Sequence, residues 1–253
     1  MNAGGGAVWC DNASPRFVDC VFEDSAAAGV GGAVRCDNAN PQFEDCSFSD
    51  NTAGGDGGAV WCSGGSPQFS NCSFDGNAAN GDGGAVWCSG GSPQFSNCSF
   101  SSNTAENGGA VGQSGGSLSF VECIFWSNTA SGDGGALRCD AGNCTLYNCT
   151  LTLNTAANGG AVSCRNAGDL TSNNTILWGN TATGSGNEVH LADATSSATL
   201  NYNCVPSNAQ DPHRYGGVTA GITENNPTYG DPQFIRPEAR GLRLSPTSPC
   251  VDA

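Results

Sequence analysis

The chain has 253 residues, among them 38 glycines and 15 cysteines, and its 8 basic residues, all arginine, stand against 23 acidic ones for a formal net charge of −15. This balance disfavours nucleic-acid binding, because neutralising phosphates needs clustered cations, and the absence of lysine excludes a lysine base or Schiff base. No window of 18 apolar residues occurs, so we expect no membrane insertion. The first ten residues do not resemble a signal peptide, yet the many cysteines indicate an oxidising, extracellular setting.

A repeat of about 26 residues organises most of the chain. Its clearest mark is Gly-Gly-Ala followed by Val or Leu, which begins at Gly5, Gly31, Gly57, Gly83, Gly108, Gly134 and Gly159, with a degenerate copy at Gly186. Residues 57–74 and 83–100 are identical over 18 positions, which indicates an internal duplication. Self-similarity at such a period is typical of solenoid proteins.

Each repeat predicts three short strands separated by turn residues. In the repeat that begins at Gly57 these are GGAVWC, the segment ending in Phe69, and the segment from Cys72 to Phe74, followed by a glycine-rich return. No segment is long enough for a helix. Side chains alternate along a strand, so the constant Val8 and Cys10 positions face inward. The position between them, which accepts Trp, Arg, Gly or Ser in later copies, faces solvent.

Coils of this length bury their apolar positions only by stacking on one another. We therefore predict an all-β, right-handed parallel β-helix of about eight three-stranded turns over residues 1–204, with residues 205–253 as an irregular C-terminal cap. Stacking at the strand spacing of roughly 4.8 Å aligns equivalent residues in columns. One such column predicts a ladder of side-chain amides: Asn51, Asn77, Asn103, Asn128, Asn154 and Asn180.

Two segments resemble known families. The pairing of GGAV with Phe69-Ser70-Asn71-Cys72 is similar to the repeats of polymorphic outer-membrane proteins, and related repeats occur in bacterial right-handed β-helix surface proteins. This resemblance covers about residues 4–185 and implies a β-helix in an extracytoplasmic setting. The segment Gly230–Ala253 resembles the choice-of-anchor-Q module that closes secreted bacterial β-helix proteins, which implies a cap over the last turn.

Cysteine spacing suggests disulfides within turns. Five repeats carry two inward cysteines ten residues apart, and we predict bonds within the pairs Cys10/Cys20, Cys36/Cys46, Cys62/Cys72, Cys88/Cys98 and Cys139/Cys149. Equivalent cysteines of neighbouring turns are an open alternative, because stacking brings them within bonding distance. Cys204 and Cys250 form a further expected pair, whereas Cys123, Cys144 and Cys164 have no evident partner. Zinc is disfavoured because no Cys-x-x-Cys occurs.

The outward positions of the first strand form the most suggestive surface feature. Stacking places Trp9, Arg35, Trp61 and Trp87 in one strip on the outer wall. Contiguous exposed apolar surface often marks a binding site, so a partner or a glycan is one interpretation. Mutual stacking of the rings, which would only stabilise the sheet, is the other.

Two further sets of residues are weaker candidates. Asp56, Asp82 and Asp133 precede the Gly-Gly turns, where they form either solvated turns or a calcium site, since stacked carboxylates repel unless a cation or an asparagine intervenes. We expect no other cofactor. Six sequons permit N-glycosylation, at Asn12, Asn71, Asn97, Asn143, Asn148 and Asn173.

The pattern favours a non-enzymatic, secreted or cell-surface module with a structural or adhesin-like role. A glycan-binding module and a polysaccharide lyase or hydrolase remain alternatives. An enzyme is disfavoured because residues 1–185 contain no insertion that breaks the repeat to build a site, and fold analogy alone does not assign activity. The first repeat begins by residue 4 with no capping segment, so we expect an upstream segment or head-to-tail self-association there. A head-to-tail contact that does not close produces a filament.

Overall fold

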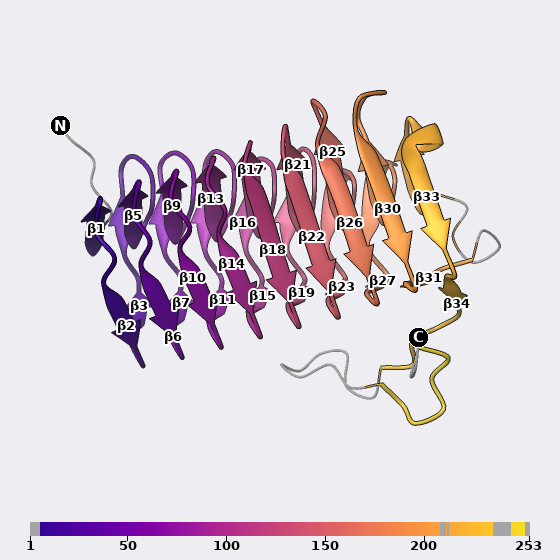
Figure 1. Ribbon diagram of the computed structural model, residues 1–253, viewed down its shortest axis with the longest axis horizontal. Helices are drawn as coiled ribbons and strands as arrows, with labels where there is room; N and C mark the ends of the chain where they lie inside the picture. Colours follow the sequence, from indigo (N-terminus) through magenta and orange to yellow (C-terminus); the bar gives the residue numbers. More distant parts are fainter. Residues whose placement is uncertain (1–5, 208–210, 212, 235–243, 251–253) are drawn as a thin grey trace.

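The computed structural model describes residues 6–207, 211, 213–234 and 244–250 as a rod of stacked coils (Figure 1). Sheet A contains β1 (Val8–Asp11), β5 (Val34–Asp37), β9 (Val60–Ser63), β13 (Val86–Ser89), β17 (Val111–Ser114), β21 (Leu137–Asp140), β25 (Val162–Arg165), β29 (Val189–Leu191) and β32 (Tyr215–Gly217). Sheet B contains β2 (Arg16–Val18), β6 (Gln42–Glu44), β10 (Gln68–Ser70), β14 (Gln94–Ser96), β18 (Ser117–Val121), β22 (Asn143–Tyr147), β26 (Asp169–Asn173), β30 (Ser197–Asn201) and β33 (Ile222–Asn225).

The other two walls complete each coil. Sheet C contains β3 (Val21–Glu23), β7 (Ser47–Ser49), β11 (Ser73–Asp75), β15 (Ser99–Ser101), β19 (Ile124–Trp126), β23 (Thr150–Thr152), β27 (Ile176–Trp178), β31 (Cys204–Val205) and β34 (Thr228–Tyr229). Sheet D, which the sequence did not predict, lies in the return: β4 (Ala26–Ala27), β8 (Thr52–Ala53), β12 (Ala78–Ala79), β16 (Thr104–Ala105), β20 (Thr129–Ala130), β24 (Thr155–Asn158) and β28 (Thr181–Ser185). A 3-10 turn, η1 (Thr219–Gly221), precedes β33.

The predicted stacking is confirmed. Val8 pairs with Val34, Val34 with Val60 and Val60 with Val86 along sheet A, and all pairings between the named strands are parallel. Equivalent residues therefore lie above one another, as the 26-residue period requires. The fold prediction of an all-β parallel solenoid with turns of about 26 residues holds.

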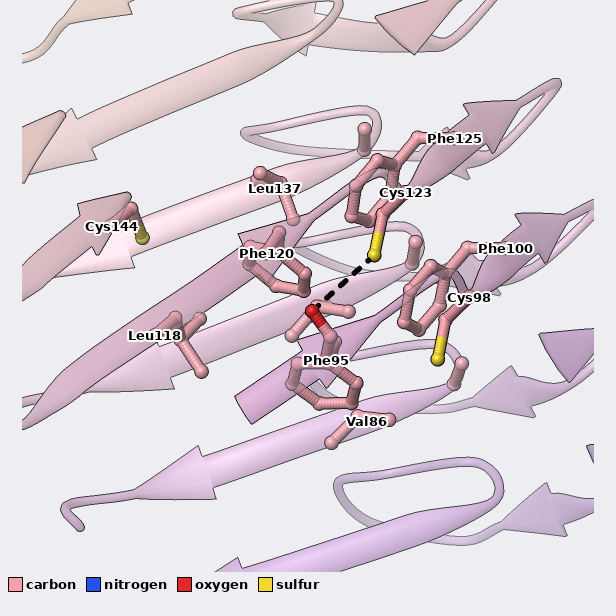
Figure 2. Packing of buried hydrophobic residues seen from close by; sticks show 14 of the residues in the cluster. Val86, Phe95, Cys98, Phe100, Leu118, Phe120, Cys123, Phe125, Leu137 and Cys144 are labelled. Atoms are coloured by element: carbon pink, nitrogen blue, oxygen red, sulfur yellow. Dashed lines mark hydrogen bonds between the residues drawn. The ribbon is translucent and has the colours of Figure 1, made fainter. Parts of the chain in front are cut away.

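Phenylalanine fills the interior in two parallel stacks. The rings of Phe48, Phe74 and Phe100 are stacked nearly parallel, 4.7 Å and 4.8 Å apart between centroids, and a second stack on sheet B meets the first edge to face. Figure 2 shows the two stacks at Phe95, Phe100, Phe120 and Phe125. These rings are fully buried, so aromatic packing and the hydrophobic effect stabilise each coil against the next.

The asparagine ladder forms as predicted. The side-chain nitrogen of Asn77 donates to Oδ1 of Asn103 at 2.9 Å and to the backbone oxygen of Phe48 at 3.0 Å, and Asn103 repeats the pattern with Asn128. All six ladder residues are buried. Each amide therefore satisfies backbone groups that the corner between sheets C and D would otherwise bury without partners.

The second glycine of each Gly-Gly pair permits the close approach of the coils. A Cβ on Gly58 would lie 2.0 Å from the carbonyl oxygen of Gly84, so a larger residue would force the coils apart. At the corner between sheets B and C the chain adopts positive φ at Asn71 (55°) and Asn97 (51°), a conformation that asparagine tolerates better than most residues.

Parallel pairing continues into the segment expected to act as a cap. Strands β32, β33 and β34 add a last turn to sheets A, B and C. Beyond it, Phe234 pairs with Leu244 in an isolated antiparallel bridge, and a disulfide joins Cys204 to Cys250, the pair that the sequence indicated. Residues 235–243 and 251–253 of the choice-of-anchor-Q-like segment lie outside the described residues.

The within-turn disulfides are not formed in the structure, which corrects that prediction. Cys139 bonds Cys144 instead of Cys149, and the other eight cysteines of the five pairs are free thiols: Cys10, Cys20, Cys36, Cys46, Cys62, Cys72, Cys88 and Cys98. The reason is geometric. The first cysteine of each pair lies within a sheet A strand and the second at the corner between sheets B and C, so each stacks on its equivalents in neighbouring turns.

Candidate functional site

The outer wall of sheet A carries most of the candidate residues. Arg35 lies between two indoles, with its guanidinium carbon 5.8 Å from the Trp9 ring centroid and 5.0 Å from that of Trp61. Asp37 accepts hydrogen bonds from the indole nitrogen of Trp9 at 2.6 Å and from Nε of Arg35 at 2.9 Å. Cation–π contacts thus occupy ring faces that a sugar would need. Trp9 is 51% exposed and remains the most accessible member of the strip.

Trp87 departs from the exposed strip that the sequence predicts. Its side chain projects from the outer face of sheet A, yet the residue is only 8% exposed. The reason lies in the next turn, where Gly112 occupies the paired position. A Cβ on Gly112 would lie 2.7 Å from the Trp87 ring, so the indole covers the space above the glycine instead of standing in solvent.

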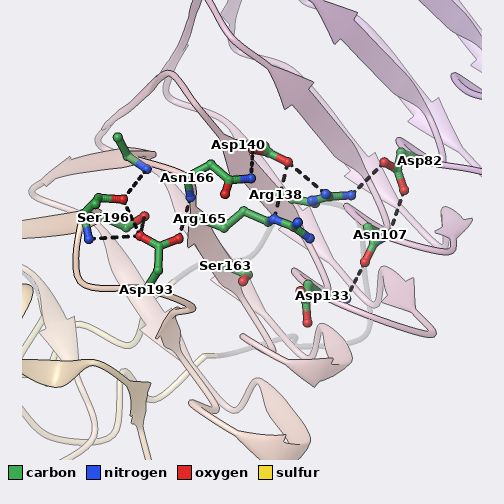
Figure 3. A network of polar contacts seen from close by, with 12 residues as sticks. Asp82, Asn107, Asp133, Arg138, Asp140, Ser163, Arg165, Asn166, Asp193 and Ser196 are labelled. Atoms are coloured by element: carbon green, nitrogen blue, oxygen red, sulfur yellow. Dashed lines mark hydrogen bonds and ion pairs between the residues drawn. The ribbon is translucent and has the colours of Figure 1, made fainter.

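A network of charged side chains follows on the same wall (Figure 3). Arg138 donates to Asp82 at 2.7 Å and to Asp140 at 2.9 Å, and its side chain is 9% exposed. Arg165 lies 3.5 Å from Asp140, which also accepts a hydrogen bond from Asn166. Each of these two carboxylates thus faces a guanidinium, an arrangement that holds turns together and does not leave a free base.

The aspartates of the return turns are linked by hydrogen bonds, and asparagine side chains contact two of them. Asn107 lies between two of them, donating its side-chain nitrogen to Asp82 at 2.8 Å and accepting the backbone N–H of Asp133 at 2.9 Å. Asn158 donates to Asp133 at 3.0 Å, and Asp56 accepts the backbone N–H of Asp82. Asp56, Asp82 and Asp133 thus lie in one hydrogen-bonded column. No group of three or more potential metal ligands occurs within the described ranges.

Two buried ionisable groups were not singled out from the sequence. Glu188 replaces the alanine of the Gly-Gly-Ala motif, and burial raises its pKa to about 8. His190 lies on the outer face of sheet A, where its Nδ1 is 3.3 Å from Oγ of the fully buried Ser163. Burial lowers the pKa of His190 while the charge of Asp133 opposes this shift. The signal for Glu188 was present, since a charged residue there replaces the alanine of the repeat.

The predicted sequons differ in access. Asn12, Asn71, Asn97, Asn143 and Asn148 are exposed, and Asn71 and Asn97 form an exposed amide pair at 2.8 Å. Asn173 is half-buried, and its Nδ2 is enclosed without a hydrogen-bond partner. Because glycan transfer needs an accessible Nδ2, Asn173 is the least suitable acceptor of the six.

A pocket of about 380 Å³ lies where the C-terminal segment meets the corner of sheets B and C. Its lining residues are Asn148, Cys149, Thr150, Asn174, Thr175, Ile176, Tyr202, Cys204, Leu244 and Cys250. Among these residues no acid, arginine or histidine occurs. The pocket therefore offers hydrogen bonds and apolar contact, and its ionisable side chains are the Cys149 thiol and the Tyr202 phenol.

Comparisons with known proteins identify the architecture. Residues 1–93 match the family model described as a right handed beta helix region. No curated protein and no solved structure matches the chain. No helix among the described residues is long and apolar enough to span a membrane. The first third of the chain is thus similar to right-handed β-helix regions, and the in-register sheets carry the same parallel β-helix architecture onward to Tyr229.

Proposed function

We propose that this protein is a secreted or cell-surface scaffold, a non-enzymatic β-helix rod with a structural or adhesin-like role. The observation that carries the proposal is the unbroken stack of turns from β1 to β34, in which every coil pairs with the next in register. Stacked phenylalanine rings and buried amides make such a rod stiff, and its outer walls supply a long, regular surface.

The state of the charged groups supports a role without catalysis. Arg138 and Arg165 are both ion-paired with carboxylates, and Asp82 and Asp133 bond to asparagines. A glycosidase needs two carboxylates free to act as acid and as base or nucleophile. The expected result with acidic and neutral polysaccharides is no release of reducing ends and no unsaturated product. Release of either would favour the lyase or hydrolase alternative.

Self-association is the second part of the proposal. Within the described residues, strands β1, β2 and β3 each pair on one side only, and the outward residues Trp9, Val18 and Val21 on them are exposed. Open strand edges next to apolar side chains are suited to pairing with another copy of the chain. A repeated end-to-end contact would extend the rod into a filament.

The experiment is sedimentation velocity with negative-stain electron microscopy over a concentration series. Val21→Lys places a charge on the edge strand at an exposed site, whereas Ser73→Lys places it at the equivalent position of the inner strand β11. We expect oligomers for the wild type and Ser73→Lys and their loss for Val21→Lys. Monomers at every concentration would contradict self-association.

Glycan binding is a second candidate, favoured by the 51% exposure of Trp9 beside Arg35. A glycan array with the wild type and Trp9→Ala tests it, and Trp87→Ala is the control because Trp87 is covered. Binding that both variants retain, or no binding at all, would exclude Trp9 as a sugar platform.

A further inference from the structure

Ten free thiols form two separate columns in the rod. The first column contains Cys10, Cys36, Cys62 and Cys88, which pair in register along sheet A. The second lies at the corner of sheets B and C and contains Cys20, Cys46, Cys72, Cys98, Cys123 and Cys149. All but Cys20, which is half-buried, are shielded from solvent.

Among the described residues, thiols of both columns interact with thiols of neighbouring turns, but only those of the second column also contact backbone oxygens. In the second column Cys72 donates to the backbone oxygen of Ser70 at 3.3 Å and approaches that of Phe43 at 3.5 Å, and Cys98 repeats both contacts one turn later. Figure 2 shows the same contact between Cys123 and the backbone oxygen of Phe95. These sulfurs are therefore stabilised as thiols by backbone acceptors.

In the first column the sulfurs face one another. Cys36 interacts with the thiols of Cys10 and Cys62, and Cys62 interacts with those of Cys36 and Cys88. No carbonyl contact of these four thiols occurs within the described residues. In-register strands lie roughly 4.8 Å apart, which is inside the Cα separation range of disulfides, about 4.4–6.8 Å.

The column has an even number of members and a defined end. Gln113 occupies the position paired with Cys88 in the following turn, so the run of cysteines stops there. All four stacked cysteines can form disulfides only when the first bonds the second and the third bonds the fourth. A central bond between Cys36 and Cys62 would leave Cys10 and Cys88 without partners.

We propose that Cys10 bonds Cys36 and Cys62 bonds Cys88, so that two disulfides join neighbouring turns along the rod axis, while the second column stays reduced. Each bond forms by thiol–disulfide exchange with a low-molecular-weight disulfide such as oxidised glutathione. One cysteine thiolate displaces a glutathione thiolate to give a mixed disulfide, and the second cysteine thiolate displaces the other. Two thiol protons pass to the two glutathione thiolates, so two protein thiols are oxidised as one glutathione disulfide is reduced. Because the column is buried in the folded rod, exchange takes place during folding.

The test is refolding of the full reduced chain with reduced and oxidised glutathione, followed by denaturation, maleimide labelling and mass spectrometry of the intact chain and its peptides. The structure has eleven free cysteines, and the two proposed disulfides use four of them, which leaves seven thiols to be labelled. We expect seven labels and a linked peptide pair containing Cys10 and Cys36. Eleven labels, nine labels with a Cys36–Cys62 link, or a Cys10–Cys20 link would each overturn the proposal.

Single substitutions separate a paired cysteine from a free one. Cys10→Ser releases Cys36 and raises the label count from seven to eight, whereas Cys46→Ser in the second column lowers it to six. The chymotryptic peptides that contain Cys62 and Cys88 have the same sequence, so a peptide map does not distinguish them. The bond between Cys62 and Cys88 is therefore tested with Cys62→Ala. Cys10→Ser loses a disulfide that closes a loop of this length, so its unfolding midpoint should be about 10 °C lower than that of Cys46→Ser. Equal midpoints with equal label counts would show that Cys10 is unpaired.

Discussion

Asn180 donates its side-chain amide to Oε2 of Glu188 at 2.5 Å, and this contact ends the asparagine ladder. Sheet D stops at β28, and within the described residues Asn180 is the last asparagine of the ladder. Glu188 enters from the Gly-Asn-Glu-Val turn at a position that is alanine in earlier turns. A carboxyl group buried inside the rod thus completes a row of amides that begins at Asn51.

The stability of the protein should fall as pH rises through the range in which Glu188 titrates. Burial raises the folded-state pKa of Glu188 to about 8 from a reference value of 4.5. The folded state therefore holds a proton that the unfolded state releases, so this contribution is complete below pH 4.5 and is lost as pH rises towards 8. The expected loss is about 1.4 kcal/mol per pH unit. Urea unfolding at several pH values measures it, and Glu188→Gln should show a weaker dependence. An equal slope in both proteins would contradict this role.

Removing one rung from the middle of the ladder should be strongly destabilising. Asn103→Ala removes the acceptor of the Asn77 backbone N–H and of one Asn77 side-chain hydrogen, and it removes the donor to the backbone oxygen of Phe74. Unsatisfied buried groups cost about 1–3 kcal/mol each, so we expect a loss of about 3 kcal/mol in the free energy of unfolding. The control is Thr104→Ala, at the neighbouring exposed position, which should change stability by less than about 0.5 kcal/mol. Similar losses in the two variants would count against the ladder.

The phenylalanine stack should respond to the shape of the substituted side chain. Phe74→Ala removes a fully buried ring between Phe48 and Phe100 and should cost about 3–5 kcal/mol. Phe74→Leu should cost less, because leucine already fills the same column at Leu151 and Leu177. Thermal and urea unfolding of both variants provide the comparison. A leucine variant as unstable as the alanine variant would show that ring stacking outweighs apolar volume.

The buried ion pairs of Arg138 and the exposed ion pair of Arg16 should differ in their effect on stability. Arg138 is 9% exposed and holds Asp82 and Asp140 together, so Arg138→Ala leaves Asp82 without a guanidinium partner and Asp140 with Arg165 alone. We expect a loss of about 2 kcal/mol, since both carboxylates keep some contact with water. Arg16, 59% exposed beside Glu44, is the control. Arg16→Ala should change stability by less than about 1 kcal/mol, and equal effects would contradict the difference.

The sequence allowed the fold to be predicted because the repeat places the same residue type at the same point of every coil. Val34 stacks on Val60 and Asn77 bonds Asn103 because the chain between them has a constant length. Features that depend on contacts with another turn or another sheet were harder to predict from the sequence. The burial of Trp87 depends on Gly112 in the next turn. The separation of Cys10 from Cys20 arises because Cys10 lies in sheet A and Cys20 at the corner of sheets B and C. The role of Glu188 could be seen only once the end of sheet D was known.

The near-identical coils that begin at Gly57 and Gly83 have a consequence for the length of the molecule. Both present the same residues to the coil before and the coil after, including Val60 and Val86 in sheet A and Phe74 and Phe100 in sheet C. Excision of residues 57–82 would bring Asp56 directly before Gly83 and shorten the rod by one strand spacing, roughly 4.8 Å, without creating a new kind of junction. Recombination between the duplicated segments can therefore change the reach of the protein in whole-coil steps while its cross-section stays constant.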